Sequence, residues 1–178
     1  MSGTGRSRLR TAAAAGLVLL AIGLAGCSSS SPKPPSATSG SNVQSENGSG
    51  VLTEYRQTVK TFPLALPKGS HFPSSPPKAL LTGQSQVGVG VGPAYFFWLC
   101  SWEAKYLQAD NSGNAADEST ALTQIEKWPS TSFVKKYVED PSNGWYTAVV
   151  APAKLGDPTG VRNDMQGGDC PAQGVPIP

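Results

Sequence analysis

Residues 94–110, AYFFWLCSWEAKYLQAD, decide the fold that we predict for this chain. Apolar residues recur there at intervals of four, three and four, at Tyr95, Leu99, Trp102 and Tyr106. This spacing places them on one face of an α-helix. Pro93 suits the first turn of that helix, because no backbone N–H is needed there. The apolar face is broad, so we expect this helix to be the central element of the core.

A second helix is predicted over residues 115–128, after a turn at residues 110–113. Acidic side chains near its start and Lys127 near its end complement the helix dipole. Because the intervening turn is short, we expect the two helices to form an antiparallel hairpin.

The other expected elements are shorter. They are a helix over 51–62, for which an extended segment is the alternative, an extended proline-rich run over 61–78, a weak strand over 87–92, a helix over 133–139 capped by Ser132, a strand over 145–151 and a helical turn over 159–165. The strand at 145–151 is expected because aromatic and β-branched residues dominate it. We therefore predict a small single α+β domain over 51–170, or a mostly α one, built on the helical hairpin and followed by a tail over 171–178.

The first residues have the composition of a secretory signal. Arg6, Arg8 and Arg10 precede an apolar, alanine-rich run over 11–26. That run is shorter than the roughly 20 residues that a membrane-spanning helix needs. We therefore expect residues 1–26 to be a signal peptide that directs export.

The apolar run ends in Leu24-Ala25-Gly26-Cys27, which resembles the lipobox of bacterial lipoproteins. The resemblance implies that the Cys27 thiol receives a diacylglycerol and that a peptidase cuts before it. The chain would then be anchored by lipid on the extracytoplasmic face of the cell membrane. The alternative is an ordinary secretory signal in which Cys27 is incidental. The domain itself resembles uncharacterised lipoproteins of high-GC Gram-positive bacteria, from which no role can be transferred.

Residues 28–50 are mainly Ser, Pro, Gly, Asn and Thr, so we expect a disordered tether after Cys27. Removal of the signal peptide also changes the charge. Fourteen Lys and Arg, less the three before Cys27, leave eleven against twelve acids, a net charge of −1. A nearly neutral domain without a basic cluster is not expected to bind nucleic acid.

If Cys27 carries lipid, Cys100 and Cys170 remain in an oxidising compartment and should pair. The bond would close a loop of about 70 residues, which would stabilise the fold by roughly 4 kcal/mol in the chain-entropy model. A reactive free thiol is the competing interpretation. A zinc site would need more ligands than two cysteines and the single, distant His71.

Motifs for catalysis are weak. His71 lies in the proline-rich run, and no serine stands in a nucleophile-elbow pattern. Gly88 to Gly92 begins like a dinucleotide fingerprint but lacks its third glycine, so we interpret these glycines as permitting close packing. The acids, Glu103 among them, are expected on solvated helix faces. We therefore predict no catalytic residue, no metal site and no cofactor. An enzyme would be favoured if Glu103 or His71 lay in a deep pocket beside a carboxyl of raised pKa.

The unusual feature is the density of aromatic residues on the central helix. They either form the core or present an exposed binding surface, for which the candidates are Tyr95, Trp98, Trp102 and Tyr106. We expect an anchored, non-catalytic domain that binds another envelope protein or the cell wall. The alternative is a small-molecule or carbohydrate site on the aromatic helix.

Overall fold

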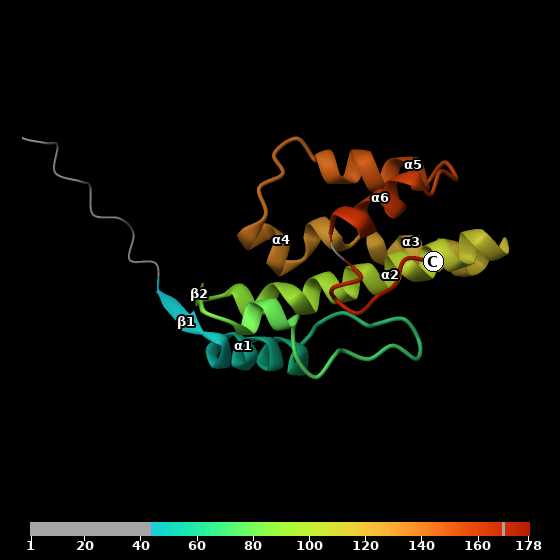
Figure 1. The fold of residues 1–178 in the computed structure, drawn as a ribbon. Helices are drawn as coiled ribbons and strands as arrows, with labels where there is room; N and C mark the ends of the chain where they lie inside the picture. The colour runs from blue at the N-terminus through green and yellow to red at the C-terminus, as the bar shows by residue number, and fades with distance from the viewer. Residues whose placement is uncertain (1–43, 169) are drawn as a thin grey trace, which may run out of the picture. The chain divides into compact units, whose positions relative to one another are not determined.

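The computed structural model describes residues 44–168 and 170–178. The predicted signal peptide, Cys27 and the tether up to residue 43 lie outside the described residues. The described part is mostly helical with one small antiparallel sheet (Figure 1). The predicted fold class is confirmed, in its mostly helical form. None of the described helices is both long and apolar enough to cross a membrane.

The elements follow one another in a simple order. The sheet consists of β1 (Ser45–Asn47) and β2 (Gln84–Gln86). The α-helices are α1 (Gly48–Lys60), α2 (Gly92–Ser112), α3 (Ala115–Ile125), α4 (Ser132–Tyr137), α5 (Ala151–Ala153) and α6 (Thr159–Gly167). Short 3-10 turns are η1 (Lys78–Leu81), η2 (Val89–Val91) and η3 (Trp128–Ser130), and η4 (Tyr146–Val150) is a π-helical turn.

Helix α2 is the central element, as expected. In Figure 1, α1 and the loop after it lie along one side of α2, and α4, α5 and α6 lie along the other. The predicted hairpin of α2 and α3 is confirmed. Gly113 ends α2 with a φ of 66°, and the Asn114 side chain accepts from the backbone N–H of Asp117 to begin α3. The core is continuous around α2 because apolar side chains from both sides pack on it.

The folded part begins before Val51, the predicted boundary. Asn47 caps α1 by accepting from the backbone N–H groups of Ser49 and Gly50, at 3.1 and 3.2 Å. Strand β1 precedes it and pairs antiparallel with β2, with Ser45 opposite Gln86. The tether prediction was therefore wrong for residues 45–50. These residues are ordered by the Asn47 cap of α1 and by the pairing of β1 with a strand far along the chain.

The weak strand predicted over 87–92 is wrong. Gly88 has a φ of 101°, and the chain then forms η2. The Glu54 carboxylate accepts from the backbone N–H groups of Gly88 at 2.8 Å and Gly90 at 3.0 Å. A Cβ on Gly90 would lie 2.7 Å from the Cβ of Glu54. The glycines do permit close packing, here of the loop against α1.

The strand predicted over 145–151 is also wrong, since these residues form η4 and the start of α5. The Asp140 carboxylate accepts from the backbone N–H groups of Gly144 at 2.7 Å and Trp145 at 3.0 Å. This capping starts a helical turn. The helical conformation also buries Val149 and Val150, and this burial outweighs the β-propensity of the segment.

The two remaining helices were predicted closely. Thr131, and not Ser132, caps α4, because its hydroxyl accepts from the backbone N–H of Val134 at 3.2 Å. Helix α6 covers the helical turn predicted over 159–165, and Asp157 accepts from the backbone N–H of Thr159 at 2.9 Å.

Candidate functional site

The four aromatic residues predicted as a binding surface lie in the core. Tyr95, Trp98, Trp102 and Tyr106 are 5%, 0%, 8% and 0% exposed. The helix therefore presents no exposed aromatic face through these residues, and a carbohydrate stacked on them is excluded. The physical reason is that other elements cover α2 on both sides, so these four side chains pack in the core.

The two indoles have a different use, which is to hold the loop between α1 and η1. Trp98 Nε1 and Trp102 Nε1 both donate to the carbonyl oxygen of Ala65, at 3.0 and 2.9 Å. Tyr55 donates from its hydroxyl to the carbonyl oxygen of Pro73 at 2.8 Å. The proline-rich loop is thus fixed to the helices at two points.

Aromatic packing fixes the same loop from within. The ring of Phe72 lies 4.9 Å from that of Phe62 and 5.5 Å from that of Phe97, between ring centres. Between the fixed points the chain turns at Gly69, whose φ is 87°, and Ser70 donates from its backbone N–H to Pro67. This turn carries Lys68, Ser70 and His71 toward α2.

The predicted pairing of Cys100 with Cys170 is present, with a Cα–Cα distance of 5.6 Å. It ties the last segment to α2, and Val175 is buried there at 7% exposure. Residues 171–178 are therefore not a free tail. Val175 donates from its backbone N–H to Cys170, which closes a compact turn.

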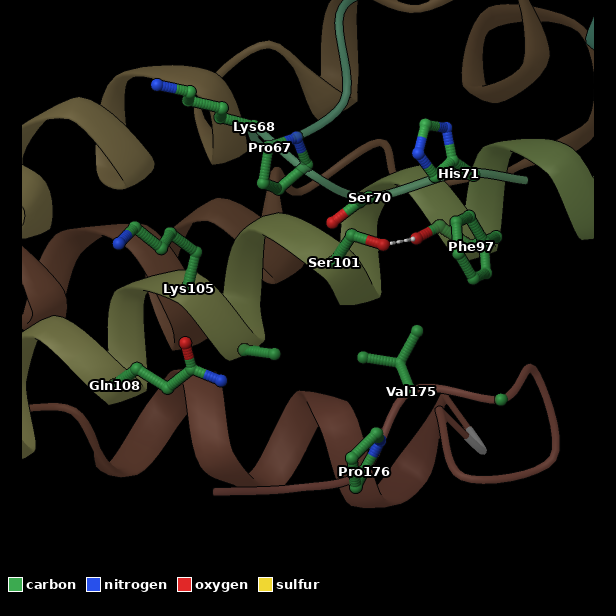
Figure 2. A pocket seen from close by; sticks show the side chains of 12 residues that line it. Pro67, Lys68, Ser70, His71, Phe97, Ser101, Lys105, Gln108, Val175 and Pro176 are labelled. Carbon is green, nitrogen blue, oxygen red and sulfur yellow. Dashed lines mark hydrogen bonds between the residues drawn. The ribbon is translucent and has the colours of Figure 1, made fainter. Parts of the chain in front are cut away.

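The loop and this last segment form the two walls of a cleft of about 560 Å³ (Figure 2). Its floor is one face of α2, which contributes Phe97, Ser101, Ala104, Lys105 and Gln108. Figure 2 shows Ser70 and Ser101 near the middle, Val175 and Pro176 across from the loop, and Lys68 and Lys105 extending toward the same end.

The cleft has the chemistry of an anion site. Lys68, Lys105 and His71 line it together with hydroxyl and amide groups, and none of the described lining residues is acidic. Lys105 Nζ also contacts Asp117 of α3 at 2.6 Å, with its side chain 37% exposed. Lys105 thus forms an ion pair between the two helices of the hairpin.

Glu103 departs most from expectation, because it is fully buried and not on a solvated face. Burial raises the pKa of its carboxyl well above 4.5, and the neighbouring Asp164 carboxyl raises it further by charge and by hydrogen bonding. Among the described residues, no hydrogen-bond donor reaches Glu103 Oε1. This carboxyl therefore keeps its proton to a higher pH than a solvated glutamic acid does.

Glu103 and Asp164 line a second, smaller cavity of about 190 Å³. The Asp164 carboxylate accepts from Trp145 Nε1 at 3.0 Å. The other lining residues are almost all apolar, and they include the disulfide. They are Phe96, Leu99, Cys100, Trp128, Val138, Trp145, Gly168 and Cys170.

Three potential metal ligands, Cys100, Glu103 and Cys170, bring their ligand atoms within 4.8 Å of one another. Both sulfur atoms are used in the disulfide, however. Only the Glu103 carboxyl remains, and one oxygen donor group does not make a metal site. His71 is exposed and lies in the larger cleft.

Sequence spacing could have identified Glu103. It stands four residues after Leu99 and four before Leu107, so its helical neighbours are core residues. No comparable pattern marks Lys68, Lys105 or Asp164, which are brought to their sites by tertiary packing.

Searches of protein-family models, curated proteins and solved structures each gave no match to this chain. The function must therefore be argued from the site itself.

Proposed function

We propose that this protein is a lipid-anchored envelope lipoprotein whose domain binds an anionic polymer of the cell wall. The lipid on Cys27 would attach it to the extracytoplasmic face of the membrane. The ligand would be a polymer segment that carries carboxylate or phosphate groups, and it would lie in the cleft between the proline-rich loop and residues 174–176.

The composition of the cleft carries this proposal. Lys68 and Lys105 place two ammonium groups at one opening, and His71, Ser70 and Gln108 offer further polar contacts. Ammonium groups hydrogen-bond strongly to ionised carboxylates and phosphates. Lys105 is also paired with Asp117, whereas neither of the two ion pairs among the described residues includes Lys68.

The walls of the cleft support binding without large rearrangement. The loop is held by the shared Ala65 carbonyl and by Tyr55, and the opposite wall by the disulfide. A preorganised site loses less conformational entropy when it binds its ligand.

We propose a binding and not a catalytic role, although Glu103 is a buried carboxyl of raised pKa that lies beside a second carboxyl. Its cavity of about 190 Å³ is little larger than one that holds benzene. Hydrolysis of a glycosidic bond needs two carboxyls on either side of the bond and room for a sugar on each side. The carboxyl pair therefore lacks the space for a polymeric substrate.

Co-sedimentation with purified cell-wall sacculi tests the proposal. The full chain in detergent is mixed with sacculi that retain their phosphate polymers and with sacculi stripped of them, which leaves peptide carboxylates. Lys68→Glu is the test variant, because it reverses one charge at the cleft. Lys60→Glu is its control, since Lys60 is an exposed lysine on α1 outside the cleft.

We expect the wild-type chain and Lys60→Glu to sediment with sacculi, with binding that weakens as salt rises. Lys68→Glu should lose most of this binding. Binding to only one of the two preparations identifies the anionic group. Equal loss in both variants, or no loss in either, contradicts a role for the cleft.

A further inference from the structure

The cavity beside Glu103 is lined by two carboxyl groups and by no cationic side chain among the described residues. Its two polar side chains are the carboxyls of Glu103 and Asp164, and no Lys, Arg or His lines it. Of the ion pairs in the described part of the chain, neither includes these two acids. Buried carboxylates are ordinarily paired with a cation. This cavity therefore lacks the partner that its chemistry favours.

Within the described part of the chain, the buried Oε1 atom of Glu103 also lacks a hydrogen-bond partner. It lies out of reach of any hydrogen-bond donor among the described residues. The other oxygen, Oε2, lies 3.9 Å from Cys170 Sγ, which carries no proton because it belongs to the disulfide. A buried acceptor left without a donor costs free energy, which a donating ligand would recover.

The rest of the lining suits an apolar body attached to a cation. Phe96, Trp128 and Trp145 supply three aromatic rings, with the Trp128 ring centre 5.5 Å from that of Phe96 and 6.4 Å from that of Trp145. Aromatic faces attract organic cations. The half-exposed Val138 and Trp145 belong to the lining, so the cavity reaches the surface.

We propose that this cavity binds a small organic ammonium ion. Its nitrogen would donate to the carboxyls of Glu103 and Asp164, and its apolar part would lie among Phe96, Trp128 and Trp145. The volume of about 190 Å³ limits the ligand to a body about the size of one benzene ring. The site is separate from the cleft, and the inference does not depend on the proposed wall binding.

A bound cation would compete with the proton on Glu103, whose pKa burial raises. Asp164 of α6 is the titratable group that acts on Glu103, and it carries negative charge when ionised. A bound ammonium favours the ionised form of both carboxyls. The complex should therefore release a proton to solvent, and a purely apolar ligand should not.

Benzylamine and benzyl alcohol form a matched pair of probes. They have nearly the same shape, but only the amine is charged at neutral pH. Calorimetric titration of each into the full chain in detergent measures their affinities. Repeating the amine titration in two buffers of different ionisation enthalpy measures the proton released.

We expect benzylamine to bind about tenfold or more tightly than benzyl alcohol, with release of a proton. Glu103→Gln should remove both the preference and the release, and Asp164→Asn should reduce the preference while keeping a polar group beside Trp145. Glu139→Gln is the control, because Glu139 is exposed and does not line the cavity.

Folding of each variant is checked by its thermal unfolding. Equal affinity for the two probes would show that the cavity is only apolar and would overturn the proposal. Failure of both probes to bind would overturn it as well, and would leave the carboxyl pair as an internal hydrogen bond of the core. An unchanged preference in Glu103→Gln would also contradict it.

Discussion

The Sγ atom of Cys170 lies 3.9 Å from Oε2 of Glu103, so the disulfide covers the buried carboxyl. The same bond joins α2 to the segment that forms one wall of the larger cleft. One covalent link therefore supports both candidate sites. Its loss should affect the stability of the fold, the cleft and the cavity together.

Removing the disulfide should destabilise the domain by about 4 kcal/mol, because the bond closes a loop with a sequence separation of 70. The double variant Cys100→Ala/Cys170→Ala tests this by urea unfolding monitored by circular dichroism. Unfolding of the wild-type chain with and without reductant gives an independent comparison. A midpoint that changes in neither experiment would contradict a structural role for the pair.

Stability should depend on pH through Glu103. Its pKa in the folded chain is raised well above 4.5, chiefly by burial and then by Asp164. The folded state therefore holds the proton more tightly than the unfolded state does. The corresponding stabilisation is complete below about pH 4.5 and is lost as pH rises through the folded pKa.

The variant Glu103→Gln removes this titration while keeping the shape of the side chain. We expect its unfolding free energy to fall less between pH 5 and pH 8 than that of the wild-type chain. Glu139→Gln controls for the removal of one exposed carboxylate. The same pH dependence in Glu103→Gln and wild type would show that Glu103 does not titrate as proposed.

Gly90 should tolerate no side chain. A Cβ there would come closer to the carbonyl oxygen of Val51 than real Cβ contacts allow, and would lie 2.7 Å from the Cβ of Glu54. Since the backbone must shift, Gly90→Ala should cost about 1–3 kcal/mol of unfolding free energy.

Gly167→Ala is the matched control, because a Cβ at Gly167 in α6 meets nothing within 4 Å. Alanine should leave the melting temperature unchanged or raise it there, since it favours helix by up to about 1 kcal/mol. If Gly90→Ala had the same melting temperature as Gly167→Ala, the close approach of Gly90 to α1 would be refuted.

The helices with strong periodicity were predicted from the sequence, and the strands were not. Spacing along residues 94–110 locates α2, and the turn at Gly113 locates the hairpin, because these are local properties. The segment at 145–151 has strand-forming residues, yet the Asp140 carboxylate and burial of Val150 make it helical. Strand β1 pairs with residues about 40 positions away, which no local pattern predicts.

The candidate sites were predicted less well than the fold. The aromatic density on α2 is a property of the core, and the indoles of Trp98 and Trp102 hold a loop. Lys68 reaches the cleft only because that loop is fixed, so its position is tertiary information. Glu103 was interpreted from its charge alone, although its apolar helical neighbours indicate burial.

The central claim is that the chain is a lipoprotein anchored through Cys27, since a wall-binding role requires display outside the membrane. Intact-mass spectrometry of the chain purified from membranes tests it most directly. We predict a mass that begins at Cys27 and includes a diacylglycerol, and loss of membrane attachment in Cys27→Ala. An unmodified chain cut elsewhere, or Cys27→Ala retained in the membrane fraction, would contradict the claim.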